Sequence, residues 1–563
     1  MASTSRAMTR LAGPQLGLRA AQRQLSAVPT VASIARLSTS STRRNLLLAA
    51  NRTSKTQSAL SLTRQARRGY ADVAPAKKPR RFRYFRWGFR LTYLYVLGSI
   101  GYVIYDGYVS RHPDDQFTPD PSKKNLVILG TGWGSVALLK KLDTENYNHR
   151  SIMEPVRQIL RSKKASAMYY EAECTHIDSE RKVIKISDNS DVKGDVHVTE
   201  VPYDLLVVGV GAENATFGIP GVRENSCFLK EIKDAQAIRT KIMDCVETAG
   251  FKDQNPEEIS RLMHMVVVGG GPTGVEFAGE LRDFFDEDIK KLVPQIADSF
   301  KVTLVEALPN VLPMFSKQLI DYTESTFKEE HIEIMTKTMV KNVTDKFIEA
   351  EITRPDGKKE LTKIPYGLLV WATGNALRPL VKDLMSQIPA QKDSRRGLAV
   401  NEYLVVQGAR DIWAVGDCAV AGYAPTAQVA SQEGAFLARL FNNMAKTEAL
   451  EAKVHELSST LNVQPGNSAQ IVKDIESTER QLRRVKDIKP FHYSHQGSLA
   501  YIGSEKAVAD VAWLNGNLAS GGKLTYLFWR SAYLSMCFST RNRVLVALDW
   551  VKAKVYGRDV SRE

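Results

Sequence analysis

Two glycine-rich loops are the residues in this sequence whose types and spacing point most directly to a chemistry. The first is Gly130-Thr-Gly132-Trp-Gly134-Ser135, and the second is Gly269-Gly-Gly271-Pro-Thr-Gly274. In such loops one glycine makes a strand-to-helix turn, one lets the backbone approach a pyrophosphate, and one lets helix and strand pack closely. N–H groups at the helix N-terminus bind the anion. Two loops in one chain predict two nucleotide cofactors held face to face, an arrangement that favours electron transfer between them.

Each loop follows an apolar run typical of a strand, 125–129 or 264–268, and opens a helical pattern. A further strand, 301–306, follows the second loop and ends in Glu306. That carboxylate can accept hydrogen bonds from both ribose hydroxyls, which favours NAD(H) over NADP. Glu306 lies further from its loop than the usual ~20 residues, and the helical stretch Val275 to Val293 accounts for the excess. A surface carboxylate that merely ends a strand remains the alternative.

Two more apolar strands end in glycines at similar distances after the two loops. Residues 203–212 lead to Gly211, and residues 366–374 lead to Gly374. This internal repeat predicts an α/β fold with two Rossmann-like domains, one inserted in the other. A later strand, 411–419, ends in Gly416 and Asp417, and in flavoproteins such an acid contacts the ribityl hydroxyls of FAD.

The segment Ala424-Pro-Thr-Ala427-Gln428-Val-Ala-Ser-Gln432-Glu-Gly434 completes a set of motifs in a fixed order. From about Lys123 to the C-terminus the chain resembles the type II (alternative) NADH:ubiquinone oxidoreductases of fungal and plant mitochondria. The resemblance implies a two-dinucleotide-binding flavoprotein that passes a hydride from NADH to FAD and then two electrons to a membrane quinone, without pumping protons. The N-terminal region is similar to that of the external members of the family, which oxidise cytosolic NADH.

The resemblance also implies roles for individual residues. FAD would be held by the first loop together with the glycine and acid that end later strands, namely Gly130, Gly132, Gly134, Ser135, Gly211, Gly416 and Asp417. NADH would be held by Gly269, Gly271, Gly274, Glu306 and Gly374. Glu276 would lie near the contact of nicotinamide and flavin, and Ala427, Gln428 and Gln432 would line the junction of flavin, NADH and quinone. We expect no metal site.

The first dinucleotide unit departs from the family pattern after Asn148. Family members have a strand and a loop of about 25 residues here, whereas this chain continues directly into His149–Pro155, a sequence typical of the start of a helix. Glu154 has the spacing of a ribose acid, but we reject it because no strand leads into it and Pro155 follows. We therefore expect the first sheet to lack a strand, with unpaired backbone groups beside the gap.

The positive charge of the chain is confined to its N-terminal region. Residues 1–90 contain 19 Lys and Arg and one acid, so the remainder sums to −3 and nucleic-acid binding is excluded for the body. Residues 1–70 are rich in Arg, Ser and Ala and are typical of a mitochondrial transit peptide, with cleavage expected near Ala71. A generic basic tail is the alternative. Within 71–122, a basic linker, we expect a single membrane segment at 91–109, or otherwise an interfacial helix.

Residues 511–563 interleave aromatic and basic residues, a pattern typical of helices that lie in a membrane interface. Core-packing or dimer helices are the alternative. The predicted domains are accordingly an FAD-binding domain at 123–245 and 376–510, an NADH-binding domain at 260–375, and this C-terminal segment. We expect a homodimer on the mitochondrial inner membrane, with the catalytic body facing the intermembrane space.

Two other functions are alternatives to the quinone reductase. The five cysteines show no C-x-x-C pairing, which argues against a disulfide reductase. A flavin-deficient, inactive NADH-binding variant of the family is the alternative that the missing strand suggests.

Overall fold

The computed structural model describes residues 81–111, 123–143, 148–151, 167–463, 468–513, 516–537 and 540–560. The predicted transit peptide at 1–70, its cleavage site near Ala71 and the rejected ribose acid Glu154 all lie outside these residues.

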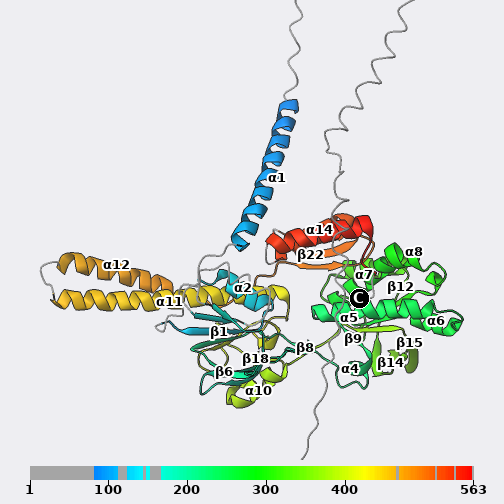
Figure 1. Ribbon diagram of the computed structural model, residues 1–563, viewed down its shortest axis with the longest axis horizontal. Helices are drawn as coiled ribbons and strands as arrows, with labels where there is room; N and C mark the ends of the chain where they lie inside the picture. The colour runs from blue at the N-terminus through cyan, green and yellow to red at the C-terminus, as the bar shows by residue number, and fades with distance from the viewer. Residues whose placement is uncertain are drawn as a thin grey trace, which may run out of the picture. The chain divides into compact units, whose positions relative to one another are not determined.

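The first domain is built on a five-stranded parallel sheet with the order β19-β7-β1-β2-β3. Its strands are β1 (Asn125–Leu129), β2 (Asn148–Ser151), β3 (Ala167–Tyr169), β7 (Leu205–Val208) and β19 (Ile412–Ala414). Strand β7 and residues 126–129 of β1 are apolar and buried because both faces of the sheet are covered here. Helix α2 (Trp133–Lys141) follows β1 and packs against the start of α11 (Ala427–Val463) (Figure 1).

The expectation that the first sheet lacks a strand after Asn148 is wrong. Strand β2 pairs in parallel with β1, with Asn148 opposite Asn125, and β3 pairs with β2 on its other side. The predicted helix start at His149 is therefore a strand, because the open edge of β1 offers backbone hydrogen bonds to the next segment of chain that can reach it. The sheet order of a dinucleotide-binding unit is kept.

The second domain has a parallel sheet with the order β12-β11-β10-β16-β9. Its strands are β9 (Cys227–Phe228), β10 (His264–Val268), β11 (Lys301–Val305), β12 (Ile332–Met335) and β16 (Leu368–Trp371). Its helical segments are α4 (Val222–Asn225), α5 (Ile232–Ala249), α6 (Pro256–Leu262), α7 (Pro272–Phe284), the π-turn η3 (Phe285–Ile289), α8 (Lys290–Leu292), η4 (Ala297–Ser299) and α9 (Lys317–Glu329). The helical stretch predicted from Val275 to Val293 is confirmed, since α7, η3 and α8 follow one another without a break.

A two-stranded antiparallel ribbon joins the two domains. Strand β8 (Glu213–Asn214) follows Gly211, strand β17 (Asn375–Ala376) follows Gly374, and Asn375 pairs with Asn214. Smaller sheets flank the large ones, formed by β4 (Glu173–Asp178), β5 (Val183–Ser187) and β6 (Val198–Pro202), by β13 (Thr338–Val343), β14 (Phe347–Thr353) and β15 (Lys359–Pro365), and by β18 (Leu398–Ala399) and β20 (Ala419–Val420). The remaining short helices are α10 (Pro379–Gln387), η5 (Pro389–Gln391) and η6 (Gly416–Cys418).

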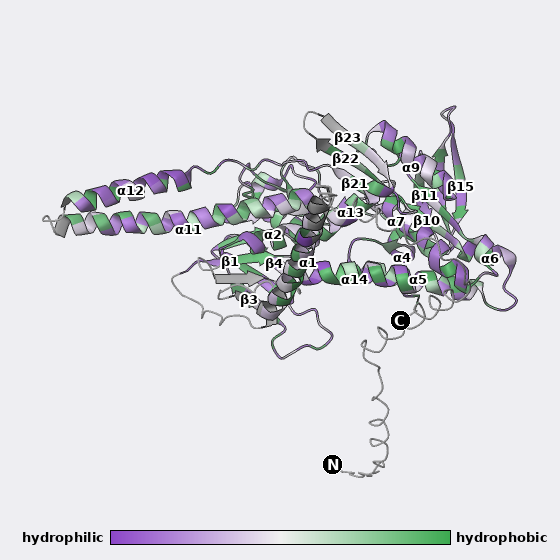
Figure 2. Cartoon of the chain, turned by 90° about the horizontal axis from the view of Figure 1, so that it is seen from above, coloured by the Kyte–Doolittle hydropathy of each residue, from purple (hydrophilic) through white to green (hydrophobic). Residues whose placement is uncertain are grey.

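Helices α11 and α12 (Ser468–Lys486) pack side by side as a long hairpin (Figure 1). Figure 2 shows polar and apolar residues interleaved along both helices, as expected of a pair that buries one stripe and exposes the other.

The C-terminal unit is a three-stranded antiparallel sheet followed by two helices. Its elements are β21 (Ser498–Tyr501), β22 (Ala507–Trp513), β23 (Gly516–Gly522), α13 (Lys523–Met536) and α14 (Thr540–Tyr556). Ala500, Ile502 and Val508 belong to the same buried cluster as residues of α5 and α7. Residues 232–249 and 498–508 therefore pack on the second sheet. The predicted FAD-binding domain, in contrast, included 232–245 and 498–508. Residues 511–513 and 516–522, predicted to be helical, belong to strands.

The predicted membrane span at 91–109 is not supported. These residues form part of α1 (Arg81–Arg111), and within the described part of the chain no helix is both long enough and apolar enough to cross a bilayer. The uncharged run is bounded by Arg90 and Asp106, which leaves it short of the usual length.

Candidate functional site

The first glycine loop is packed too tightly for side chains at two of its positions. Gly130 has a φ of +88°, and a Cβ on it would lie 2.3 Å from the carbonyl oxygen of Gly209. A Cβ on Gly134 would lie 2.9 Å from Cγ2 of Val415. The loop therefore contacts the ends of β7 and β19, and the structure brings together the glycines that the sequence analysis assigned to one cofactor.

The hydroxyl of Ser135 is fully buried in the first turn of α2 and has no hydrogen-bond partner among the described residues. Leaving a buried hydroxyl without a partner costs about 1–3 kcal/mol. Gly132 is the N-cap of this helix, and the nearest heavy atom to a Cβ built on it is 4.0 Å away. A buried donor beside an open helix N-terminus fits the pyrophosphate of a dinucleotide.

Asp417 lies in the turn η6, directly after β19, as predicted for the ribityl acid. Nζ of Lys230 lies 3.6 Å from Oδ2 of Asp417 and donates a hydrogen bond to Oδ1 of Asn375 at 2.6 Å. Since Asn375 begins β17, this lysine links the acid to the ribbon between the domains. Lys230 could not be predicted as a site residue from the sequence, because a single lysine between a short strand and a helix carries no recognisable pattern.

The second glycine loop resembles the first, because some of its glycines leave no room for a side chain and another faces open space. Gly269 has a φ of +120°, and a Cβ on Gly274 would lie 1.9 Å from the carbonyl oxygen of Gly269. A Cβ on Gly271, the N-cap of α7, would have no heavy atom within 4 Å. The open position is the one at which the backbone must approach a phosphate, so the loop fits a second dinucleotide.

Glu306 lies at the end of β11, beside the second loop. Its carboxylate accepts hydrogen bonds from the N–H groups of Gly270 and of Leu308, the latter at 2.7 Å. The carboxylate is thereby fixed at the edge of the loop, where a ribose acid is expected, and each oxygen keeps a second lone pair for a hydroxyl donor.

The two glycines that follow β7 and β16 adopt left-handed conformations. Gly211 has a φ of +66° and Gly374 a φ of +79°. A Cβ on Gly374 would lie 2.5 Å from the ring of Phe217, whereas a Cβ on Gly211 would meet no heavy atom within 4 Å. Both turns lead directly into the ribbon, so they set the path of the chain between the domains.

Glu276, on the first turns of α7, is covered by the C-terminal unit. Its Oε1 accepts hydrogen bonds from the Tyr501 backbone N–H and from Nε1 of Trp529, both at 3.1 Å. The Tyr533 hydroxyl lies 3.5 Å from both carboxylate oxygens. Burial raises the pKa of Glu276, although these three hydrogen bonds act in the opposite direction. The carboxyl is therefore more readily protonated near neutral pH than an exposed glutamate.

Gln428 and Gln432 project from the first turns of α11 and are held by the segment 493–497. Nε2 of Gln428 donates to the carbonyl oxygen of Gly497 at 2.9 Å, and its Oε1 accepts from the Tyr493 hydroxyl at 3.1 Å. Gln432 makes a two-way pair with the backbone of Ser494, at 2.8 and 2.9 Å. Ala427 is the first residue of the same helix.

The segment 493–501 consequently connects the two groups of predicted residues. At one end it binds Gln428 and Gln432 of α11, and at the other the Tyr501 backbone binds Glu276 of α7. The residues expected at the junction of flavin, NADH and quinone are thus tied together by the start of the C-terminal unit.

The aromatic side chains around Glu276 were placed by the sequence analysis at a membrane interface and not at the site. Trp529 and Tyr533 are one helical turn apart on α13, with ring centroids 4.4 Å apart, and the tilted ring of Tyr501 lies 5.4 Å from that of Trp529. The helical spacing was visible in the sequence, but the partner of this face was not, because it lies on α7 more than 200 residues earlier.

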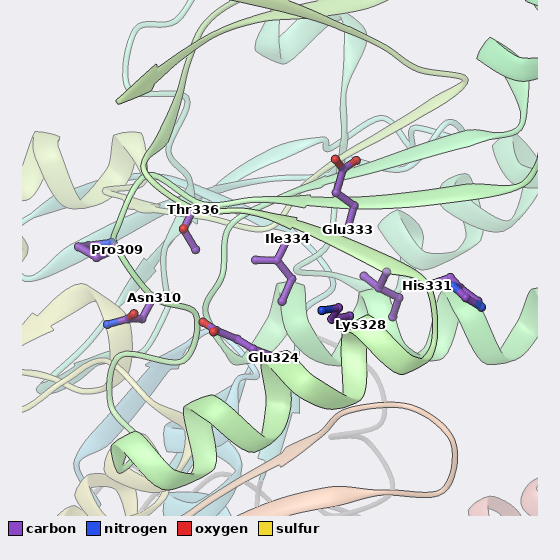
Figure 3. A pocket seen from close by; sticks show the side chains of 9 residues that line it. Pro309, Asn310, Glu324, Lys328, His331, Glu333, Ile334 and Thr336 are labelled. Carbon is purple, nitrogen blue, oxygen red and sulfur yellow. The ribbon is translucent and has the colours of Figure 1, made fainter. Parts of the chain in front are cut away.

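A separate pocket of about 550 Å³ lies between α9 and β12, at the edge of the second sheet (Figure 3). It is lined by Pro309, Asn310, Glu324, Lys328, His331, Ile332, Glu333, Ile334 and Thr336. None of the predicted site residues lines it, so it is distinct from the arrangement around Glu276.

The cysteines do not form a redox pair. All five are free, and burial raises the pKa of Cys174 to about 12 and those of Cys245 and Cys418 to about 11, which keeps these thiols protonated. Among the described residues, no group of three or more His, Cys, Asp or Glu side chains is arranged to hold a metal ion.

Comparison with known proteins identifies two family models in the chain. Residues 124–434 match pyridine nucleotide-disulphide oxidoreductase, and residues 495–559 match the NDH2 C-terminal domain. The second match begins inside the segment that binds Gln428 and Gln432.

Curated relatives match along most of the chain. The external alternative NADH-ubiquinone oxidoreductase of Yarrowia lipolytica is 57% identical over 521 residues, covering 86% of this chain and 89% of that protein. The external NADH-ubiquinone oxidoreductase 2 of Saccharomyces cerevisiae is 42% identical, covering 85% and 91%. A solved structure, NDH2 from Plasmodium falciparum in complex with NADH, matches with a TM-score of 0.66 and 26% identity, covering 78% of this chain and 100% of that one.

The Yarrowia alignment also bears on the predicted omission after Asn148. The alignment spans 521 residues. It covers 86% of the 563 residues of this chain, which is fewer residues than the alignment spans. This chain therefore lacks residues that the relative has within the aligned region, which agrees with an internal omission such as the one predicted.

Proposed function

The chain belongs to the pyridine nucleotide-disulphide oxidoreductases and, among them, to the mitochondrial type II NADH:ubiquinone oxidoreductases, and from this membership we propose that it oxidises NADH and reduces ubiquinone without pumping protons. The observation that carries the proposal is the segment 493–501, which joins Gln428 and Gln432 to Glu276.

Two dinucleotides fit the two glycine loops. FAD would be held by Gly130, Gly132, Gly134, Ser135, Gly211, Gly416 and Asp417, and NADH by Gly269, Gly271, Gly274, Glu306 and Gly374. Bound FAD would supply the redox chemistry, by accepting a hydride from NADH and passing two electrons to quinone. The buried Ser135 hydroxyl and the open N-caps Gly132 and Gly271 support these assignments. The contribution of the protein is then mainly to orient the reactants.

Glu276 is the residue that we assign to proton supply. Reduction of a quinone to a quinol consumes two protons as well as two electrons, so a group that is protonated near neutral pH is needed beside it. The raised pKa makes Glu276 a better proton donor to a quinone than an exposed glutamate would be, and Trp529 and Tyr533 fix its orientation. Ala427, Gln428 and Gln432 would line the same junction and position the head group.

The C-terminal helices support membrane association. Large apolar side chains are exposed on α13 and α14, among them Leu524, Leu527, Phe528, Leu545, Leu548, Val551 and Val555. Apolar residues on otherwise basic helices suit the interface of a bilayer that supplies a lipidic substrate. Together with the basic N-terminal region, this supports a mitochondrial inner-membrane protein, and the likeness to relatives named as external enzymes supports a body that faces the intermembrane space. We also propose a homodimer, in which the exposed apolar side chains of α14 are the candidate interface.

The flavin-deficient variant loses the part of its motivation that a missing strand provided. It rested on a gap in the first sheet, and β2 fills that position by pairing with both β1 and β3.

The function is tested on the full-length protein purified in detergent. We expect one FAD per chain, measured from flavin absorbance, and NADH-dependent reduction of a short-chain ubiquinone. Asp417→Ala should lose FAD, whereas the matched control Asp393→Ala, which changes an exposed acid, should retain it. A folded protein with neither flavin nor quinone reduction would overturn the proposal.

A further inference from the structure

A buried carboxyl that has no role in the function described above lies beside the predicted FAD site. Glu433, on α11, is only 2% exposed, and its Oε2 accepts a hydrogen bond from the Gly416 N–H at 2.6 Å. Gly416 opens the turn η6, and the next residue is Asp417. Glu433 therefore holds the turn that presents the predicted ribityl acid.

Close packing prevents this contact from being replaced by another. A Cβ on the adjacent Gly434 would lie 1.9 Å from the carbonyl oxygen of Gly134, so α11 is pressed against the first glycine loop at this point. Gly416 has a φ of +74°, and its N–H donates to a carboxyl that is itself almost fully buried. A buried N–H that loses its acceptor is costly, and the turn would rearrange to satisfy it.

The charged and titratable groups near Glu433 are few. Asp417 and the Cys418 thiol lie on the turn that it holds, and Lys230 lies on the far side of Asp417, paired with it at 3.6 Å. Burial raises the pKa of Glu433 to about 7, and the negative charge of Asp417 acts in the same direction, whereas the Gly416 N–H favours the ionised form. The carboxyl can therefore change its charge in the neutral range.

We propose that Glu433 is a positioning residue for FAD, since its hydrogen bond to Gly416 fixes the turn from which Asp417 contacts the ribityl chain. This inference rests on the proposed FAD site. An ionised carboxylate is a stronger acceptor than a protonated one, so the turn is held more firmly at alkaline than at acidic pH. FAD is accordingly retained more tightly at pH 8 than at pH 6.

The experiment measures FAD release from the full-length protein, followed by the rise of flavin fluorescence after dilution, between pH 6 and pH 8. For the wild type we expect release to be about fivefold faster at pH 6. In Glu433→Gln the amide oxygen still accepts from Gly416 but does not titrate. Release should then be independent of pH, at the rate that the wild type shows at pH 6.

Glu433→Ala should lose FAD at every pH, and Glu456→Gln, an exposed glutamate on the same helix, should match the wild type. Far-ultraviolet circular dichroism shows whether each variant has folded. If Glu433→Ala has not folded, the inference is tested with Glu433→Gln alone. A wild-type pH dependence that persists in Glu433→Gln would overturn the inference and leave the proposed function intact. A folded wild type without FAD would overturn both.

Discussion

Nε1 of Trp529 donates a hydrogen bond to Oε1 of Glu276 at 3.1 Å, across a sequence separation of 253 residues. The glutamate lies on the helix that begins at the second glycine loop, and the tryptophan lies on the first helix of the C-terminal unit. The helix whose N-terminus would bind the NADH pyrophosphate is therefore in direct contact with the unit that we assign to the membrane.

The first prediction concerns the protonation of Glu276. Glu276→Gln keeps the hydrogen bonds from Trp529 and Tyr501 but removes the proton, so quinone reduction should slow by about 100-fold. Reduction of the bound flavin by NADH should be nearly unchanged. Steady-state assays with a short-chain ubiquinone and anaerobic stopped-flow measurements separate the two half-reactions.

The pH dependence provides the control for this prediction. Burial raises the pKa of Glu276, so the wild-type carboxyl stays protonated to a higher pH than usual and quinone reduction should fall as pH rises through that pKa. Glu276→Gln should lack this alkaline decline. An unchanged turnover number with an unchanged pH profile would rule out a role in proton supply.

Glu306→Gln should raise the KM for NADH by about tenfold, with a smaller fall in kcat, because a ribose acid contributes to binding more than to chemistry. The amide also replaces one of the two oxygens that accept from Gly270 and Leu308, so part of the effect comes from the loop itself. Glu247→Gln, an exposed glutamate on α5, is the matched control. If KM stays at the wild-type value, Glu306 does not contact the ribose.

Local patterns sufficed to predict the elements around the two loops. The strands 125–129 and 264–268 were predicted with the bounds that β1 and β10 have, and the exits at Gly211 and Gly374 do lead into a shared ribbon. These features depend on apolar runs and on glycines, whose conformational needs are set by residues close in sequence.

Long-range pairing could not be predicted in the same way. Asn148–Ser151 has no strand-like pattern of its own, and it becomes β2 because β1 offers an open edge. Glu433 and Trp529 carry no motif that identifies their partners, which lie on other elements. The predicted extent of the FAD-binding domain, 376–510, likewise took no account of β21, which packs on a helix far earlier in the chain.

A third prediction tests the close contact between α11 and the first loop. Gly434→Ala should lower the melting temperature and reduce the FAD content, because its Cβ would lie 1.9 Å from the Gly134 carbonyl oxygen. Overpacking of this kind costs about 1–3 kcal/mol. Gly194→Ala, where a Cβ meets no heavy atom within 4 Å, serves as the control in the same thermal and absorbance measurements. Equal FAD content in the two variants would contradict the packing argument.

A final prediction concerns acid stability of the second domain. His264 is 5% exposed at the start of β10, its Nε2 lies 2.8 Å from the Thr303 hydroxyl, and burial lowers its pKa to about 4. In the unfolded chain the pKa returns to the ordinary histidine value of 6.5, so the unfolded state binds the proton first as pH falls. The stability present above pH 6.5 should therefore be lost progressively towards pH 4, by about 2 kcal/mol at pH 5.

His264→Gln removes this titration while keeping a polar side chain opposite Thr303. Thermal unfolding of both proteins at pH 7.5 and pH 5 is the measurement, and the melting temperature of the variant should fall less between the two conditions. His455→Gln, an exposed histidine on α11, should behave like the wild type. If His264→Gln and the wild type lose stability equally on acidification, other groups account for the acid sensitivity, and the buried histidine is not its source.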